Sequence, residues 1–411
     1  MHIITRSLLA WFIAVFLIFT NPEKTHSKEI LIGYLEGDWS FQEGWGEHPG
    51  DMKNLKEYSP HRPIDGAYVG LNDAQFLGRS MKITYVLEKR SGKTADDLFS
   101  EIQNLYTKSD VRFFIADIPH KTLVELGKKV KGMDVLLFNV SAYEDDLRGK
   151  FCVKNIMHIL PSYSMLADAL AQYLMRKKWT KVLVLEGQQN EDKEMTKSFI
   201  RSAERFRLEV DEQRTFHLSQ DPRKRDVNRP EQLTRRKSRV EQITQGRTDA
   251  YDVIFVADHH GEFAHSIPYR SVLARPVVGS EGLSAKAWHW SYLRHGAPQV
   301  SSRFEKAHMR RMQDNDWAAM VAVKAISEAI LRTKSENIAD IHKYLLKQDL
   351  KLDGFKRGGY SFRLWNNQLR QRILLATSNW TVAVPPLKEF LHEKDDLDTL
   401  GYDEPESKCS F

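Results

Sequence analysis

Short apolar runs alternate with longer amphipathic segments along most of the chain. Apolar runs typical of buried strands lie at 29–36, 81–87, 111–116 and 134–140. Between them, apolar residues recur every three or four positions, which predicts helices at 65–76, 94–107 and 121–131. Strands that alternate with helices in this way form a parallel sheet with helices on both faces. The first part of the chain is therefore predicted to be an α/β unit.

The same alternation restarts in the second part of the chain. Strands are predicted at 181–186, 252–257 and 276–279, with a short one at 207–212, and helices at 164–176 and 191–206. Further on, the pattern predicts helices at 317–331 and 338–348. A hairpin around Asn366 and Asn367 is predicted from 360–365 and 370–376. A chain of 411 residues is too long for one core and suits two such units.

The segment before the first strand has the layout of an export signal. Arg6 precedes an almost unbroken apolar run at 7–20, Asn21 and Pro22 break the run, and small residues follow at 25–27. The run is short for a membrane span, although an uncleaved anchor is the alternative interpretation. No cysteine stands directly after the run, where a lipid would be attached, so a lipid anchor is not expected. We expect residues 1–27 to be a signal peptide and the protein to be periplasmic.

Charge and cysteine content refine this picture. The net charge of +6 is small for this length and does not by itself indicate a nucleic-acid partner, and none is expected. The basic segment 221–245 is either an anion-binding or partner-binding patch, or a solvated surface. The only cysteines are Cys152 and Cys409. In an oxidising compartment they are expected to form a disulfide worth ~4 kcal/mol, and two unpaired thiols are the alternative.

One segment has the context of a phosphate-binding loop but lacks its pattern. Ser91, Gly92, Lys93 and Thr94 follow a strand and open a helix, yet Leu87 stands where the first glycine of the loop is required. We therefore expect a turn in which Thr94 caps the helix.

The densest group of potential ligands follows the strand at 252–257. It contains Asp258, His259, His260, Glu262 and His265. A metal site, contact with an organic ligand and a surface loop are all open, although adjacent histidines do not easily face the same way.

Other polar residues follow the carboxyl ends of strands, where open α/β sheets bind ligands. The residues predicted to bind a small ligand are Asp117, Ser141, Ser162, Asp258, His259, Glu262 and Glu281. No hydrolase elbow, HExxH helix, CxxC pair or dinucleotide fingerprint is found, so we assign no catalytic residue, metal ligand or cofactor.

Particular strings resemble a known family. Two α/β units behind an export signal resemble the periplasmic substrate-binding proteins of ABC transporters, in particular the branched-chain amino-acid (Leu/Ile/Val) type. Residues 77–80 before the second strand and 316–319 at the late helix carry this resemblance. Further strings are similar to the subset associated with PQQ-dependent alcohol oxidation, namely 147–150 with Cys152, 161–170, 172–174, 279–283, 368–371 and 398–406 with Cys409.

The resemblance implies a type I periplasmic binding fold, an α/β fold with two Rossmann-like lobes whose parallel sheets are joined by a multi-strand hinge. Lobe one would hold 28–150 plus 280–352, and lobe two 151–279 plus 353–384, followed by a tail at 385–411. The chain would cross between the lobes near 143–160, 276–282 and 350–360.

The function implied is that of a monomeric, non-enzymatic solute-binding protein that serves an ABC permease of the inner membrane. It would bind a small polar organic ligand between the lobes. Two alternatives are a periplasmic accessory protein that binds a quinoprotein dehydrogenase, PQQ or a metal, and a metal-dependent hydrolase built on 258–265.

Overall fold

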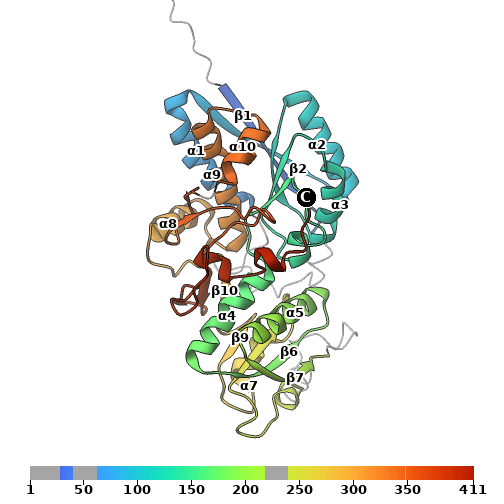
Figure 1. Ribbon diagram of the computed structural model, residues 1–411, viewed down its shortest axis with the longest axis vertical. Helices are drawn as coiled ribbons and strands as arrows, with labels where there is room; N and C mark the ends of the chain where they lie inside the picture. Colours follow the sequence, from blue (N-terminus) through green and yellow to red (C-terminus); the bar gives the residue numbers. More distant parts are fainter. Residues whose placement is uncertain (1–27, 40–62, 218–238, 348) are drawn as a thin grey trace, which may run out of the picture.

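The computed structural model describes residues 28–39, 63–217, 239–347 and 349–411. The predicted signal peptide and most of the basic segment lie outside these residues. Two parallel β-sheets organise the described chain, and they lie one above the other in Figure 1. In this part of the chain, no helix is long and apolar enough to cross a membrane.

The first sheet has five parallel strands in the order β2-β1-β3-β4-β5. Every residue of β3, β4 and β5 is buried, as expected for strands covered on both faces. The register pairs Glu36 with Asp117, so that β1 and β3 end together at one edge. The strands are β1 (Lys28–Glu36), β2 (Ile83–Ser91), β3 (Phe113–Asp117), β4 (Leu136–Asn139) and β5 (Ile156–His158).

Helices cover both faces of this sheet. Alternate residues of β1 divide between the faces: Ile32 and Tyr34 pack with α1 and α9, whereas Leu35 packs with α2 and α3. Two more helices, α8 and α10, add to the α9 side. The helices are α1 (Ile64–Gly78), α2 (Ala95–Ser109), α3 (His120–Val130), α8 (Ala297–His308), α9 (Asp314–Thr333) and α10 (Ile338–Leu345).

Two local features explain how these helices are placed. At Gly66 a side chain would collide with the backbone of Asp316, so glycine lets α1 approach α9 closely. Thr94 begins α2: its Oγ1 accepts from Asp97 N at 3.2 Å, and Thr94 N donates to Asp97 Oδ2 at 3.0 Å. This capping box confirms that the segment 91–94 is a helix-capping turn.

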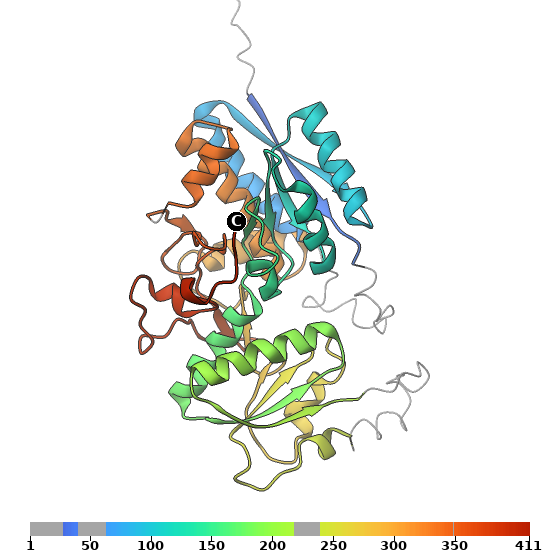
Figure 2. The ribbon, with the colours of Figure 1, turned by 45° about the vertical axis from the view of Figure 1, so that its right-hand side comes forward.

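The second sheet has four parallel strands in the order β7-β6-β8-β9. Its central strand β8 is fully apolar and buried, and β6 is apolar and buried between Lys181 and Glu186. Helices α4 and α5 cover one face (Figure 2). The short α7 (Ile267–Arg270) packs on the other face. The remaining elements are β6 (Lys181–Glu186), β7 (Glu209–Thr215), β8 (Val253–Ala257), β9 (Val277–Gly279), α4 (Tyr163–Lys177) and α5 (Asn190–Arg205).

The late hairpin differs from the sequence prediction. A short turn does form around Asn366 and Asn367: Phe362 and Leu369 make an antiparallel bridge, and Arg370 N donates to Ser361 O at 2.8 Å. The longer arms that were predicted do not pair with each other beyond this turn in the described chain. The second arm instead forms β13 (Leu374–Ala376), which pairs with β10 (Ser284–Lys286) and β14 (Thr381–Ala383). The first arm forms β12 (Gly359–Tyr360), which pairs with β11 (Leu352–Asp353). The arms diverge because one continues the first core and the other joins the second.

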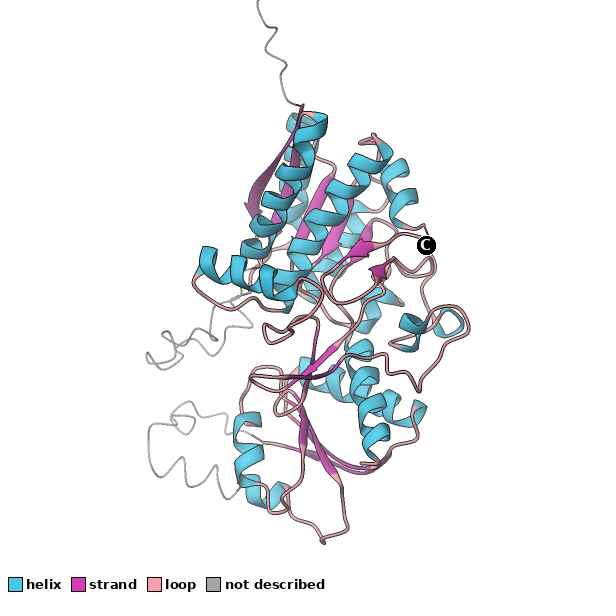
Figure 3. Cartoon of the chain, turned by 90° about the vertical axis from the view of Figure 1, so that its left-hand side faces the viewer, coloured by secondary structure: helices cyan, strands magenta, loops and turns pink. Residues whose placement is uncertain are grey.

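Three passages connect the two main cores, at 159–162, 280–287 and 361–373 (Figure 3). The second passage contains the short strand β10. The third lies later in the chain than the predicted crossing at 350–360, because Leu352 and Tyr360 still pack in the first core. The lobe boundaries given above stay a prediction.

Two buried side chains tie these passages together. Lys356 is fully buried, and its Nζ donates to Ala287 O at 2.5 Å, Arg372 O at 2.9 Å and Gln371 Oε1 at 3.1 Å. Gln371 in turn donates from Nε2 to Ile159 O at 2.6 Å. Each passage therefore contributes at least one group to a single polar network.

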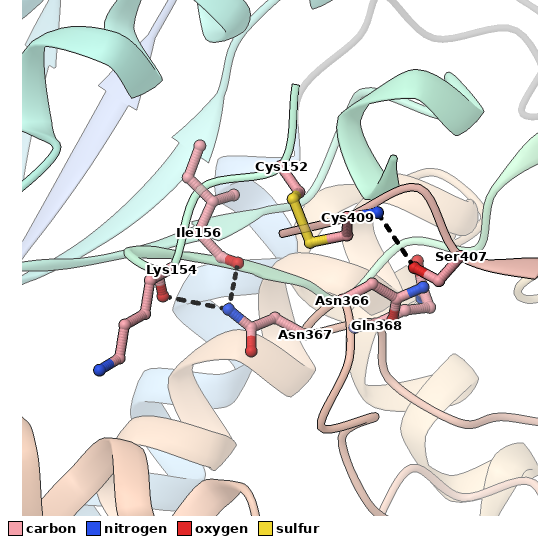
Figure 4. Close-up of a disulfide and its surroundings, with 8 residues drawn as sticks. All are labelled: Cys152, Lys154, Ile156, Asn366, Asn367, Gln368, Ser407 and Cys409. Atoms are coloured by element: carbon pink, nitrogen blue, oxygen red, sulfur yellow. Dashed lines mark hydrogen bonds between the residues drawn. A yellow bond between two sulfur atoms is a disulfide. The ribbon is translucent and has the colours of Figure 1, made fainter. Parts of the chain in front are cut away.

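The predicted disulfide is confirmed. Cys152 and Cys409 are bonded, with their Cα atoms 5.6 Å apart, although 257 positions separate them in sequence (Figure 4). Close to the bond, Asn367 donates to Lys154 O at 3.0 Å and Ile156 O at 3.1 Å. The C-terminal tail is thus attached to the first unit beside β5 (Figures 1 and 4).

Replacing both cysteines should lower stability. A protein with Cys152→Ser and Cys409→Ser is expected to lose about 2–4 kcal/mol of unfolding free energy, because the unfolded chain is no longer cross-linked. Thermal unfolding followed by circular dichroism measures this. A reductant should lower the Tm of the original protein and leave that of the variant unchanged, and equal responses would contradict the prediction.

Gln371→Leu should also destabilise the protein. The change leaves Ile159 O and one N–H of Lys356 without partners, at a cost of about 1–3 kcal/mol for each. The urea midpoint is expected to fall, with Gln299→Leu as the control, because Gln299 is exposed on α8. A midpoint equal to that of the control would show that this network is not important for stability.

Candidate functional site

Loops at the carboxyl ends of both sheets meet at two tyrosines. Tyr143 follows β4, Tyr163 begins α4, and their rings stack with centroids 5.5 Å apart. The Tyr163 hydroxyl lies 3.3 Å from Nδ1 of His259, which follows β8. The Tyr143 hydroxyl lies 3.4 Å from Oδ2 of Asp314, at the start of α9. We call Tyr143, Tyr163, His259 and Asp314 the tyrosine junction.

Charged side chains surround the tyrosine junction. Burial raises the pKa of both phenols well above the usual value. The next largest cause is the carboxylate of Asp314 for Tyr143 and that of Glu144 for Tyr163. Lys286 lies near the junction on the β10 side, since its charge lowers the pKa of both His259 and Asp314. Burial is the larger influence on each, and it lowers the pKa of His259 to about 4.

Glu144 has an unused acceptor. The residue is 9% exposed, and its Oε2 has no hydrogen-bond partner within the described residues. Burial raises the pKa of the carboxyl group, while the charges of His120 and Arg148 act in the opposite direction. A buried polar oxygen without a partner is unfavourable, so Glu144 offers an acceptor to a ligand with N–H or O–H groups.

Arg148 holds the loop that presents Tyr143 and Glu144. Its Nη1 donates to Ala142 O and Glu144 O, both at 3.0 Å, and its Nη2 donates to Leu160 O at 2.9 Å. Its Nε donates to Gln368 Oε1 at 2.8 Å. Burial lowers the pKa of Arg148 to about 10, and the nearby carboxylates oppose that shift. One guanidinium therefore connects the loop to two of the passages between the cores.

Asp117 and Ser141, two predicted site residues, are brought together at the end of the first sheet. Ser141 Oγ donates to Asp117 Oδ1 at 2.6 Å, and Tyr34 OH donates to Asp117 Oδ2 at 2.9 Å. Both predicted residues are buried. Their hydrogen bonds position the loop that leads to Tyr143.

Ser162 has a capping role. Its Oγ accepts from Met165 N at 3.4 Å and begins α4. The cap places Tyr163 in the first turn of the helix, beside His259.

Asp258, His259 and Glu262 lie together at the end of the second sheet. Asp258 accepts from the amides of Glu262, Phe263 and Ala264 at 2.7–2.8 Å, which folds the loop back on itself. Glu262 Oε1 accepts from Gln189 Nε2 at 3.1 Å. Residue His259 is exposed as a whole, while Nδ1 of its ring is directed at the Tyr163 hydroxyl.

Asp192 anchors the same loop and was not predicted. It accepts from His259 N at 2.7 Å and from Gln189 N at 3.0 Å. Burial, with smaller contributions from Asp258 and Glu262, raises the pKa of Asp192 to about 7.

The remaining predictions for this region have different outcomes. Glu281 pairs with His265 at 2.6 Å on the surface of the second unit. The rings of His259 and His260 are nearly perpendicular, at 89°. Among the described residues, no group of three or more His, Cys, Asp or Glu is arranged to hold a metal.

His259 was predicted as a site residue, whereas the two tyrosines, Glu144, Lys286, Asp192 and Asp314 were not. Tyr143 and Glu144 follow Ser141 directly, so their place after a strand was the available signal. Lys286, Asp192 and Asp314 had no comparable signal, because only the folded chain brings them to the tyrosine junction.

No protein-family model matches the sequence, and no curated protein is significantly similar to it. Solved structures do match. A branched-chain amino-acid ABC transporter periplasmic ligand-binding protein from Burkholderia xenovorans LB400 gives a TM-score of 0.67 at 13% identity, covering 93% of this chain and 99% of that chain.

Two further solved structures have the same arrangement. A leucine-, isoleucine-, valine-, threonine- and alanine-binding protein from Brucella ovis, in its closed conformation, gives 0.66 at 13% identity over 93% and 99% of the two chains. A solute-binding protein from R. palustris in complex with benzoate gives 0.61 at 11% identity over 93% and 100%. The chain therefore has the predicted α/β fold of type I periplasmic binding proteins.

Asp192 and His259 should give opposite pH dependences of stability. The folded state holds the Asp192 proton up to about pH 7, so this group loses stabilising effect as pH rises from 4 to 7. The folded state resists protonation of His259 down to about pH 4, whereas the unfolded chain takes up this proton near pH 6.5. The stabilising contribution of His259 is therefore lost as pH falls from 6.5 to 4.

Variants separate the two effects. Relative to the original protein, the Tm of Asp192→Asn should rise with pH between 4 and 6.5, and that of His259→Gln should fall. Differential scanning calorimetry across this range measures both differences. Parallel slopes for the two variants would contradict the assignment.

Proposed function

We propose that the chain is the solute-binding component of an ABC importer, working in the periplasm, with its ligand held at the tyrosine junction. The observation that carries this proposal is the convergence of carboxyl-end loops from both sheets on Tyr143, Tyr163 and His259. Open parallel sheets bind ligands at this edge. The named functions of proteins with the same fold support the proposal further.

The chemistry of the junction favours a small polar ligand with hydrogen-bond donors. Glu144 supplies an acceptor without a partner, and the phenols supply flat apolar faces. His259 is neutral above about pH 4 and can accept or donate. A ligand ammonium or hydroxyl group suits these partners better than a carboxylate, which would face Glu144 and Asp314.

Ligand binding would draw the two lobes together by motion in the three passages. Lobe one would carry the first sheet and lobe two the second, with the three passages between them. The closed form would be the one that the membrane permease recognises, and the ligand acts by favouring that form. Asp117, Ser141, Ser162, Asp258, Glu262 and Glu281 would shape the loops of the site or lie at its edge.

Tyr163 provides the direct test. A thermal-shift screen with amino acids, polyols, amines and organic acids identifies the ligand class, and calorimetry then measures its affinity. Tyr163→Ala should weaken binding at least tenfold, about 1.4 kcal/mol, because the ring stacked on Tyr143 and the hydroxyl contact with His259 are both lost.

The matched control is Tyr269→Ala, because Tyr269 is 86% exposed on α7. This variant should bind like the original protein. Equal loss in both variants, or no stabilising compound of these classes, would contradict the proposed site.

The C-terminal strings resemble those of binding proteins associated with PQQ-dependent alcohol oxidation. A pull-down with a periplasmic quinoprotein dehydrogenase tests this link separately.

A further inference from the structure

A cavity of about 910 Å³ is lined by residues other than those of the tyrosine junction. Its walls are β14, the loop between β10 and α8, and the turn before β12. Three arginines line it: Arg294, Arg357 and Arg372. Tyr292 and Trp380 line the same cavity. No residue of the proposed ligand site contributes to these walls.

The three guanidinium groups lack carboxylate partners. Within the described chain, none of them lies within 4.0 Å of an Asp or Glu oxygen, and Nε of Arg372 is buried without any hydrogen-bond partner. All three lower the pKa of Tyr292 against the larger effect of burial, which places them around one phenol. Like charges gathered in one cavity repel one another, so an anion would stabilise them.

Apolar side chains line the same cavity. Trp380 is 59% exposed and Leu293 is 62% exposed, values that are high for large apolar groups. Val382 on β14 is also exposed. Exposed indole and aliphatic surface next to guanidinium groups suits a ligand that has both a ring and negative charges.

The backbone of the cavity is held in an uncommon conformation. His295 and Arg357 have φ values of 56° and 61°, which residues other than glycine seldom adopt. Such a backbone conformation is unfavourable unless its surroundings compensate, and such positions cluster at binding sites. Phe355 packs under Gly296 and connects the two turns.

We propose that this cavity binds a planar aromatic anion that carries two or more carboxylates. Each carboxylate would accept paired hydrogen bonds from a guanidinium, and the ring would lie against Trp380. The cavity falls within the usual size range of small-molecule sites. This site is independent of the proposed solute site, because the two share no lining residue.

Benzene-1,3,5-tricarboxylate is the probe, with citrate and benzoate as comparisons, measured by isothermal titration calorimetry on the full exported protein at low salt. The tricarboxylate should bind at least tenfold more tightly than either comparison. The double variant Arg294→Gln with Arg357→Gln should lose at least tenfold in affinity, and Trp380→Ala should weaken the aromatic probe but leave citrate unchanged.

Two controls separate a built site from general charge attraction. Arg270→Gln removes an exposed arginine outside the cavity and should bind the probe normally. Tyr163→Ala should also bind it normally, so failure of the solute site and failure of this site are distinguishable. No binding at about 1 mM probe, equal binding of citrate, or equal loss in Arg270→Gln would each overturn the proposal.

Discussion

The structure depends on satisfying the backbone where the chain passes between its two cores. Passages that lie largely outside helices and sheets cannot pair all their own amides and carbonyls, and buried groups without partners cost about 1–3 kcal/mol each. Here side chains supply the missing partners. Lys356 donates to carbonyls of two passages, and Gln371 connects it to the third. Lys356 also lies 3.7 Å from the centre of the Trp317 ring, which partly compensates a buried positive charge.

The same requirement determines the shape of the candidate site. Gln368 donates to His158 O and Leu160 O at 3.1–3.2 Å and accepts from Arg148, which in turn holds the carbonyls of Ala142 and Glu144. The loop bearing Tyr143 is therefore bonded to the passages themselves. A shift in the passages would move this loop, and a ligand on the loop would in turn favour one arrangement of the passages.

Periodicity was sufficient to predict the main sheets and their helices. Strands such as β3 and β8 are continuous apolar runs, and Thr94 with Asp97 is a local capping pattern, so both can be identified without tertiary contacts. The turn of the late hairpin was predicted, but the partner of its second arm was not, because local pattern cannot show that β13 pairs with β10, about ninety residues earlier. The pairing of Cys152 with Cys409 was predictable because the chain has no other cysteine.

The site was only partly predictable for a related reason. Polar residues at strand ends were found, yet the side-chain oxygens of Asp258 and Ser162 accept hydrogen bonds from nearby backbone amides. Sequence alone cannot show whether such an oxygen binds a ligand or the local backbone. The aromatic contacts join Tyr143, Tyr163 and His259 across more than a hundred positions. Nothing in the local sequence of any one of them specifies the other two.

The two candidate sites differ in charge, and this difference argues for different ligands. Glu144, Asp314 and nearby acids face the tyrosine junction, so an anion there would meet repulsion as well as attraction to Lys286. The arginine-lined cavity presents three guanidinium groups and an exposed indole. A shared fold does not specify the ligand, so the charge of each site must do so. The acidic junction would favour a solute with hydrogen-bond donors, and the arginine-lined cavity an aromatic anion.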